Sequence, residues 1–154
     1  MKGYKTAVQI VLKSGDMECV MGLALKGVSE AIRFVLKSGD LEYITRLALN
    51  DNFNAKKFVF KSGNLKYVAQ LAMRGDSHAI NIMLDSEDYE TIVNLAKSGE
   101  LRAVQKVLQS GNLEYITKLA ESGNLDAVQV VLLSNRLEYI SRLALKGGSK
   151  TVKK

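Results

Sequence analysis

Two side chains in this sequence, His78 and Cys19, are of types that act as nucleophiles, general bases or metal ligands, and each type occurs only once. Nucleophilic catalysis needs a base beside the nucleophile, and a metal site needs several converging ligands. We therefore expect no catalytic residues, no metal site and no cofactor. His78 is interpreted as a solvated surface residue, and Cys19 as a side chain that packs as a small hydrophobe.

Carboxylates could serve acid/base catalysis only as a close pair, but the most regular acidic residues are spaced by 24 residues or multiples of 24. They are Glu18, Glu42, Glu90, Glu114 and Glu138. This spacing places a single glutamate at the same position of five repeat units, where it complements the positive N-terminus of a helix. No glycine-rich phosphate loop is expected, since each glycine is assigned to a helix end. We expect the protein not to be an enzyme.

Two columns of polar residues are better candidates for a binding site. Apart from Gly22 in the first column, every member can donate hydrogen bonds and none is acidic. The first column gives the predicted ligand-binding row, and the second gives an alternative surface row. The first row is Arg46, Gln70, Asn94, Lys118 and Arg142; the alternative row is Gln9, Arg33, Lys57, Asn81, Gln105 and Gln129. Regular donors suit a peptide backbone or a phosphate chain, but such residues are also ordinary exposed helix formers.

Two further columns are aromatic or apolar. Tyr43, Tyr67, Tyr115 and Tyr139 form one. They could stack on bases, although packing beside the core with an exposed hydroxyl is the favoured interpretation. The other column consists of Ile10, Phe34, Phe58, Ile82 and Val130. It is expected either to make contacts between repeats or to form an exposed apolar ridge.

The elements that position these columns follow from the glycines, ten of which share one phase of a 12-residue period. They are Gly3, Gly15, Gly27, Gly39, Gly63, Gly75, Gly99, Gly111, Gly123 and Gly147. Asp51, Glu87 and Asn135 fill the gaps in this glycine series. Asn and Asp are the residues that best replace glycine at positive φ, so only Glu87 departs from the pattern.

Twelve segments separate these positions and alternate between two types, so the true repeat is 24 residues long and occurs six times. Places in a segment are counted from the residue after the glycine position. First-type segments have Ala at place 4 and apolar residues at places 8 and 9, and second-type segments have Leu-Ala at places 8 and 9. Apolar places 4, 5, 8 and 9 form one stripe of a helix and fit no strand. Glycine ends each helix, and the following Asp or Asn caps the next.

Helices of about ten residues are too short to persist alone, so neighbours must hold them. Short turns and a constant period predict an all-α solenoid of six two-helix repeats over residues 1–147, forming a superhelix. Residues 148–154 are predicted to be a basic, disordered tail. The pattern resembles the α-solenoid class that includes HEAT, armadillo and ankyrin-like arrays. The 24-residue unit is shorter than the repeats of those families, so the resemblance implies architecture and no particular binding residues.

Charge, cysteine content and hydropathy indicate where in the cell the protein would be found. Lysines near the two ends supply most of the formal net charge of +6, so the body is nearly neutral. Residues 1–75 hold 12 basic and 6 acidic residues, whereas residues 76–154 hold 10 of each. A single cysteine fits a reducing compartment, and no apolar run is long enough to span a membrane. We expect a cytoplasmic protein without membrane contact.

A scaffold for a protein or extended peptide is the first functional expectation, because extended helical surfaces usually serve such partners. A nucleic-acid-binding helical repeat is the alternative, supported by the acid-free columns and opposed by the lack of a dense basic stripe. A third possibility is a structural protein that self-associates end to end, since neither terminal repeat has a polar cap.

Overall fold

The computed structural model describes residues 2–151, and the side chains of residues 3–147. Twelve α-helices and no strand occur among these residues. The predicted all-α solenoid of twelve short helices is therefore confirmed. No helix of the described part of the chain combines the length and the apolar character needed to cross a bilayer.

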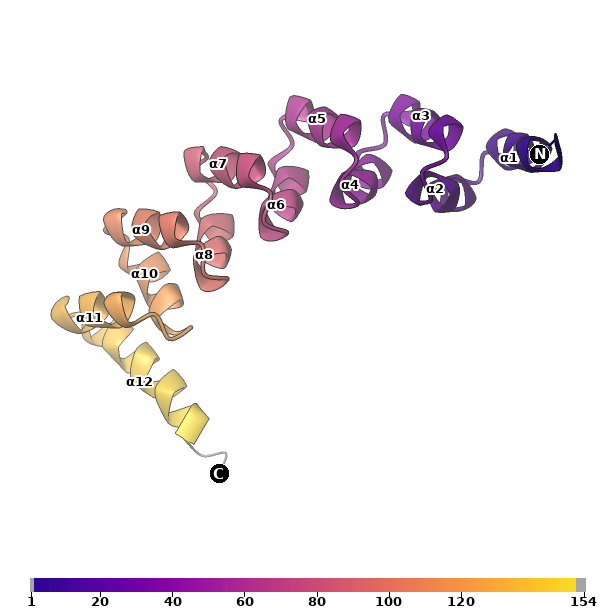
Figure 1. Cartoon of the computed structure of the whole chain (residues 1–154). Coiled ribbons are helices and arrows are strands. Elements are labelled where there is room, and N and C mark those ends of the chain that lie inside the picture. Colours follow the sequence, from indigo (N-terminus) through magenta and orange to yellow (C-terminus); the bar gives the residue numbers. More distant parts are fainter. Residues whose placement is uncertain (1, 152–154) are drawn as a thin grey trace. The chain divides into compact units, whose positions relative to one another are not determined.

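The helices form two compact units, Met1–Ala79 and Ile80–Lys154, whose boundary lies within α7 (Ser77–Asp85). The first unit also contains α1 (Lys2–Ser14), α2 (Met17–Leu25), α3 (Ser29–Ser38), α4 (Leu41–Leu49), α5 (Phe53–Ser62) and α6 (Leu65–Met73). The second also contains α8 (Tyr89–Lys97), α9 (Leu101–Gln109), α10 (Leu113–Ala120), α11 (Leu125–Leu133) and α12 (Leu137–Thr151). Within each unit, odd-numbered helices form one row and even-numbered helices the other (Figure 1).

The core of each unit lies between the two rows. Alanine at place 4 of the odd-numbered helices is fully buried at Ala31 and Ala55 in the first unit, and at Ala103 and Ala127 in the second. A methyl side chain lets the backbones approach closely, which explains the constant alanine. The leucine and alanine at places 8 and 9 of α4, α6, α8 and α10 are also buried.

The most extensive helix pairs are α2 with α3, α4 with α5, α8 with α9, and α10 with α11. Each joins a second-type helix to the following first-type helix. The repeat defined from the sequence begins with a first-type segment. The helix pairs with the most extensive contact begin one helix later, with a second-type helix.

The turn after α2 shows how the second-type helices end. The Gly27 N–H donates to the Ala24 carbonyl at 2.9 Å, and the Val28 N–H donates to the Leu23 carbonyl at 3.1 Å. This is the Schellman arrangement, with glycine at φ 83°. The bond to the place-8 leucine carbonyl recurs after α4, α6 and α8. The leucine thus fills the core with its side chain while its carbonyl closes the turn.

The predicted substitutes for glycine are confirmed, since Asp51 and Asn135 have φ of 61° and 55°. Among the described residues no other non-glycine side chain adopts positive φ, so Glu87 does depart from the pattern. Gly147 lies inside α12, which runs on to Thr151. The boundary predicted after residue 147 therefore falls within a helix. The disorder of 148–154 stays a prediction, and residues 152–154 lie outside the described residues.

Side-chain caps hold the helix starts. Asp16, Asp40, Asn52, Asn64, Asp76, Asp88, Asn112 and Asn124 accept backbone N–H groups of the first turn, as predicted. Val28 and Glu100 occupy the same place without a capping bond.

A serine column that the sequence analysis passed over has a clear structural role. Ser38 Oγ donates to the Val35 carbonyl at 2.7 Å and accepts the Asp40 N–H at 3.2 Å. The same pair of bonds occurs at Ser14, Ser62, Ser86, Ser110 and Ser134. Each serine links the end of an odd-numbered helix to the start of the next helix. Its strict 24-residue spacing was the signal that could have revealed it.

Candidate functional site

The predicted ligand-binding row lies on the even-numbered helices, and its charged members are engaged in ion pairs. The guanidinium of Arg46 on α4 binds both carboxylate oxygens of Glu18 on α2, at 2.7 and 3.2 Å. Such a two-pronged contact fixes the orientation of the guanidinium. Arg46 is therefore already matched by an acceptor from the preceding repeat.

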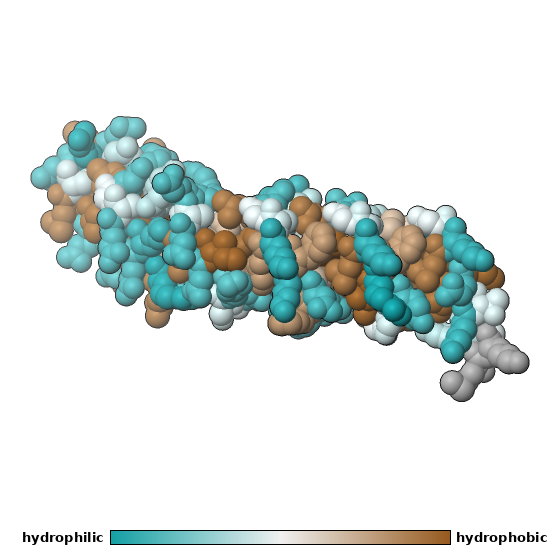
Figure 2. All heavy atoms as spheres, turned by 90° about the horizontal axis from the view of Figure 1, so that it is seen from above, coloured by the Kyte–Doolittle hydropathy of each residue, from teal (hydrophilic) through white to brown (hydrophobic). Residues whose placement is uncertain are grey.

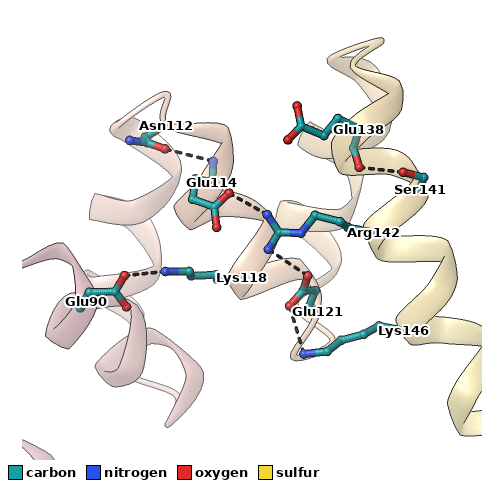
Figure 3. A network of polar contacts seen from close by, with 9 residues as sticks. All are labelled: Glu90, Asn112, Glu114, Lys118, Glu121, Glu138, Ser141, Arg142 and Lys146. Atoms are coloured by element: carbon teal, nitrogen blue, oxygen red, sulfur yellow. Dashed lines mark hydrogen bonds and ion pairs between the residues drawn. The ribbon is translucent and has the colours of Figure 1, made fainter.

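The other two basic members repeat this arrangement. Lys118 Nζ lies 2.5 Å from Glu90 Oε1, and Arg142 Nη1 lies 2.6 Å from Glu114 Oε2. Figure 3 shows both pairs, each joining neighbouring even-numbered helices of the second unit. In all three pairs the partners are 28 residues apart, which is one repeat plus about one helical turn. The glutamate column, assigned to helix dipoles from the sequence, thus also serves contacts between repeats.

Two members of the row, Gln70 and Asn94, are uncharged and form no ion pair with the residue 28 positions earlier. Gln70 stands 28 residues after Glu42, and Asn94 stands 28 residues after Lys66. Both uncharged members of the row are exposed. The structure therefore divides the predicted row into three paired cations and two exposed amides.

These ion pairs shift the pKa values of the residues that form them. The hydrogen bond from Arg46 holds the pKa of Glu18 below its usual value. The hydrogen bonds that Arg46, Lys118 and Arg142 donate to Glu18, Glu90 and Glu114 raise the pKa of these three basic side chains. Because these pairs are exposed to water and salt, they contribute little to stability.

Arg142 also belongs to a small cluster at the C-terminal end of α10. Its second guanidinium nitrogen lies 3.3 Å from Glu121 Oε1, and Lys146 Nζ lies 3.1 Å from Glu121 Oε2 (Figure 3). Burial alone would raise the pKa of Glu121, but the two cations outweigh it and lower the pKa. The Arg142 guanidinium therefore contacts two carboxylates.

The 28-residue rule makes a prediction at Gln70. Changing Gln70→Arg should create an ion pair with Glu42 and stabilise the protein by about 0.5 kcal/mol. Urea denaturation at low salt measures the change. The gain should vanish in a Glu42→Gln background and shrink at high salt. An equal gain in that background would show that arginine acts through helix propensity rather than pairing.

The tyrosine column lies beside the same row, and its members are half-buried. The rings of Tyr89 and Tyr115 stack with centroids 5.2 Å apart, and Lys118 Nζ lies 5.5 Å from the centre of the Tyr115 ring. Arg46 makes the equivalent contact with Tyr43 at 5.5 Å. Tyr43 and Tyr115 thus contact other side chains of the protein itself, and packing of the whole column beside the core stays a prediction.

Cys19 occupies the tyrosine place in the first repeat, but it does not pack in the core. It is exposed, and its thiol donates to Asp16 Oδ2 at 3.4 Å. The expectation that Cys19 packs as a small apolar side chain was wrong, because its thiol is turned to the exposed carboxylate of Asp16. The hydrogen bond to Asp16 raises the thiol pKa, which opposes nucleophilic reactivity. His78 is exposed as expected, with its ring edge against Phe60.

The alternative row lies on the odd-numbered helices, and all six of its members are exposed: Gln9, Arg33, Lys57, Asn81, Gln105 and Gln129. The apolar column runs beside it. Ile10, Phe34 and Phe58 are 65%, 36% and 38% exposed. In Figure 2, which looks onto the odd-numbered helices, apolar patches alternate with hydrophilic side chains. Of the two interpretations left open, the exposed apolar ridge describes these three positions and Val130, which is 36% exposed, but not Ile82, which is half-buried.

A hollow of about 240 Å³ joins the alternative row to this ridge between α1 and α3. Its lining residues are Gln9, Leu12, Glu30, Arg33, Phe34 and Lys37. A second hollow of about 210 Å³ shares Gln9 and Glu30 with the first. Both are smaller than the roughly 300–1,000 Å³ of typical small-molecule sites. Hollows of this size suit single side chains of a larger partner.

A larger hollow, of about 320 Å³, lies near the α4–α5 and α6–α7 turns, and its lining includes Asp51, Lys56, Arg74 and Asp76. Lys56 stands where other repeats have Val or Ile, and its Nζ lies 2.9 Å from Asp51 and 3.1 Å from Asp76. Hydrogen bonds to these carboxylates raise the lysine pKa. Because Asp51 and Asp76 both bind the Lys56 ammonium, this cluster links the turn between α4 and α5 to the turn between α6 and α7.

Among the described residues, no group of three or more His, Cys, Asp or Glu side chains is arranged to hold a metal ion. The comparisons with known proteins add no candidate site. No protein-family model, no curated protein and no solved structure matches the chain.

Proposed function

We propose that the protein is a non-enzymatic binding module that takes up a protein or extended peptide on its odd-numbered helices. The exposed ridge of Ile10, Phe34 and Phe58 carries this proposal. Exposed apolar side chains within a polar surround are typical of protein interaction sites, because contact with a partner removes apolar surface from water. A lone cysteine supports placing this activity in the cytoplasm, where thiols stay reduced.

The state of the even-numbered row supports moving the proposed contact surface from that row to the odd-numbered helices. Arg46, Lys118 and Arg142 each have a carboxylate partner. A ligand would have to displace these glutamates before it could use the cations. The cations of the alternative row, Arg33 and Lys57, form no ion pair within the described part of the chain and require no such exchange, although Asn81 already accepts a hydrogen bond from Arg102.

Nucleic-acid binding is the second candidate, because the odd-numbered helices of the first unit carry several exposed cations. Arg33, Lys37, Lys57 and Lys61 all lie on α3 and α5. Phosphate contacts of this kind give affinities that fall steeply with salt, since each neutralised phosphate releases counterions. Protein contacts through an apolar ridge depend on salt far less.

A selection from a displayed random-peptide library tests the first candidate directly. We expect enriched peptides that bind the wild-type protein and lose at least about tenfold in affinity for a Phe34→Ser/Phe58→Ser variant. The matched control is Leu101→Ser/Leu125→Ser, which removes two exposed leucines of the second unit. Circular dichroism confirms that both variants are folded.

Two outcomes would contradict the proposal. One is a selection that enriches no peptide above background. The other is fluorescence anisotropy in which a labelled single-stranded oligonucleotide stays bound at physiological salt while the selected peptides do not compete. That result would put nucleic acid first. Light scattering on the same samples would reveal the third expectation, association between copies.

A further inference from the structure

The odd-numbered helices of the first unit differ in charge from those of the second. At place 10, α1, α3 and α5 have Lys13, Lys37 and Lys61, whereas α9 and α11 have Gln109 and Leu133. Place 6 follows the same trend, with Arg33 and Lys57 on α3 and α5 and glutamines on α9 and α11. At places 6 and 10 the basic residues therefore belong to one unit, on the helices that carry the Ile10–Phe34–Phe58 ridge. α9 of the second unit has Arg102 and Lys106 at other places, where Arg102 pairs with Glu100 and Lys106 donates to the Leu84 carbonyl.

These cations lack the carboxylate partners that the even-numbered row has. Within the described part of the chain, Lys13, Arg33, Lys37 and Lys61 form no ion pair. Elsewhere in the first unit, the exposed Arg46 has Glu18 and the half-buried Lys56 has two aspartates. The positive charge on this face is thus left unmatched by the chain itself.

The hollow between α1 and α3 brings the unmatched charge and the apolar ridge together. Leu12 and Phe34 contribute its apolar lining, and Arg33 and Lys37 contribute its cations. A side chain of leucine or phenylalanine size could seat there while a neighbouring carboxylate reaches a lysine or arginine. Phe58 and Lys61 occupy the equivalent places one repeat later, so the combination recurs along the face.

We propose that α1, α3 and α5 bind an acidic peptide segment with interspersed apolar residues. Its leucine or aromatic side chains contact Leu12, Phe34 and Phe58, and its carboxylates face Arg33, Lys37 and Lys61. The proposal rests on the peptide-binding function proposed above and names the class of partner. Complementary charge supplies selectivity and rapid association, and the buried apolar anchors supply most of the affinity.

An acidic peptide fits this surface better than a nucleic acid. Glu30 lines the same hollow and would repel a phosphate, whereas a peptide can place an amide group there. The lining also offers an apolar side chain a place to be buried, whereas a nucleic acid could use Phe34 only by stacking a base on its ring. Nucleic acid is accordingly kept as an outcome of the test.

Three fluorescein-labelled peptides of equal length serve as probes in fluorescence anisotropy at physiological salt. The first repeats Asp-Phe-Glu-Leu, the second replaces its apolar residues by Ser, and the third replaces its acidic residues by Lys. We expect the first to bind at least about tenfold more tightly than either of the others, because only it provides both charge and anchors.

Two charge variants then locate the site. Lys37→Glu/Lys61→Glu should weaken binding of the acidic–apolar peptide at least about tenfold and strengthen binding of the basic–apolar peptide. Lys26→Glu/Lys97→Glu makes the same change in net charge at exposed positions outside this face, and should change either affinity less than about twofold. Equal weakening by the two variants would overturn the proposal, since it would show attraction to net charge alone.

The two tests together distinguish failure of the acidic-peptide proposal from failure of the peptide-binding function. If the displayed library yields binders that lack acidic residues, or whose affinity is unchanged by Lys37→Glu/Lys61→Glu, the peptide-binding function stands and the acidic partner is rejected. If the library yields none and a labelled oligonucleotide binds, both proposals fail together.

Discussion

Replacing Leu119→Ala should destabilise the second unit by about 3 kcal/mol, within the range of roughly 2–5 kcal/mol for buried leucines. Leu119 is 1% exposed and belongs to the Leu-Ala pair that recurs at places 8 and 9 of the second-type segments. Alanine would remove the apolar side chain and leave a cavity between the two helix rows. The turn itself should survive, because the Leu119 carbonyl still accepts the Ser122 N–H and hydroxyl.

Urea denaturation followed by circular dichroism measures this effect, with Leu133→Ala as its control. Leu133 is 72% exposed at the end of α11, so its truncation should change stability by less than about 0.5 kcal/mol. In a repeat architecture each helix pair depends on its neighbours, so part of the unit should lose structure at lower urea than the rest. Similar losses in both variants would show that Leu119 is not a core residue in solution.

The leucine column shows why so much of this fold could be predicted. A short helix reveals its buried stripe through spacing alone, and glycine or its substitutes mark where it ends. Asp51 and Asn135 were assigned to positive φ because few other side chains tolerate that conformation. Both the periodicity and the turn chemistry act locally along the chain, so a single sequence displays them.

The candidate site was harder to predict because it depends on contacts between repeats. Arg46 looked like a free donor, since nothing local shows that Glu18, 28 residues earlier, reaches its guanidinium. Lys56 likewise interrupts the apolar place 5 of the first-type segments, and the sequence pattern does not show that Asp51 and Asp76 bind its ammonium. Which polar side chains stay free for a partner is decided by the offset between neighbouring helices, and the sequence pattern leaves that offset open.

Replacing Thr117→Val should stabilise the protein by about 1–2 kcal/mol, although most core substitutions destabilise. Thr117 is fully buried at place 6 of α10, and its hydroxyl makes no hydrogen bond within the described part of the chain. A buried polar group without a partner loses its hydrogen bonds to water and gains none in return. Valine keeps nearly the same shape and removes that cost.

The repeat supplies the matched control, because α8 already has Val93 at the same place, also buried. Val93→Thr should therefore destabilise by an amount similar to the gain from Thr117→Val, when both are measured by urea denaturation. Stability changes of opposite sign in these two variants would assign the effect to the hydroxyl rather than to side-chain size. A loss of stability in Thr117→Val would instead mean that the hydroxyl finds a partner in solution, such as a buried water, and that its burial has no net cost.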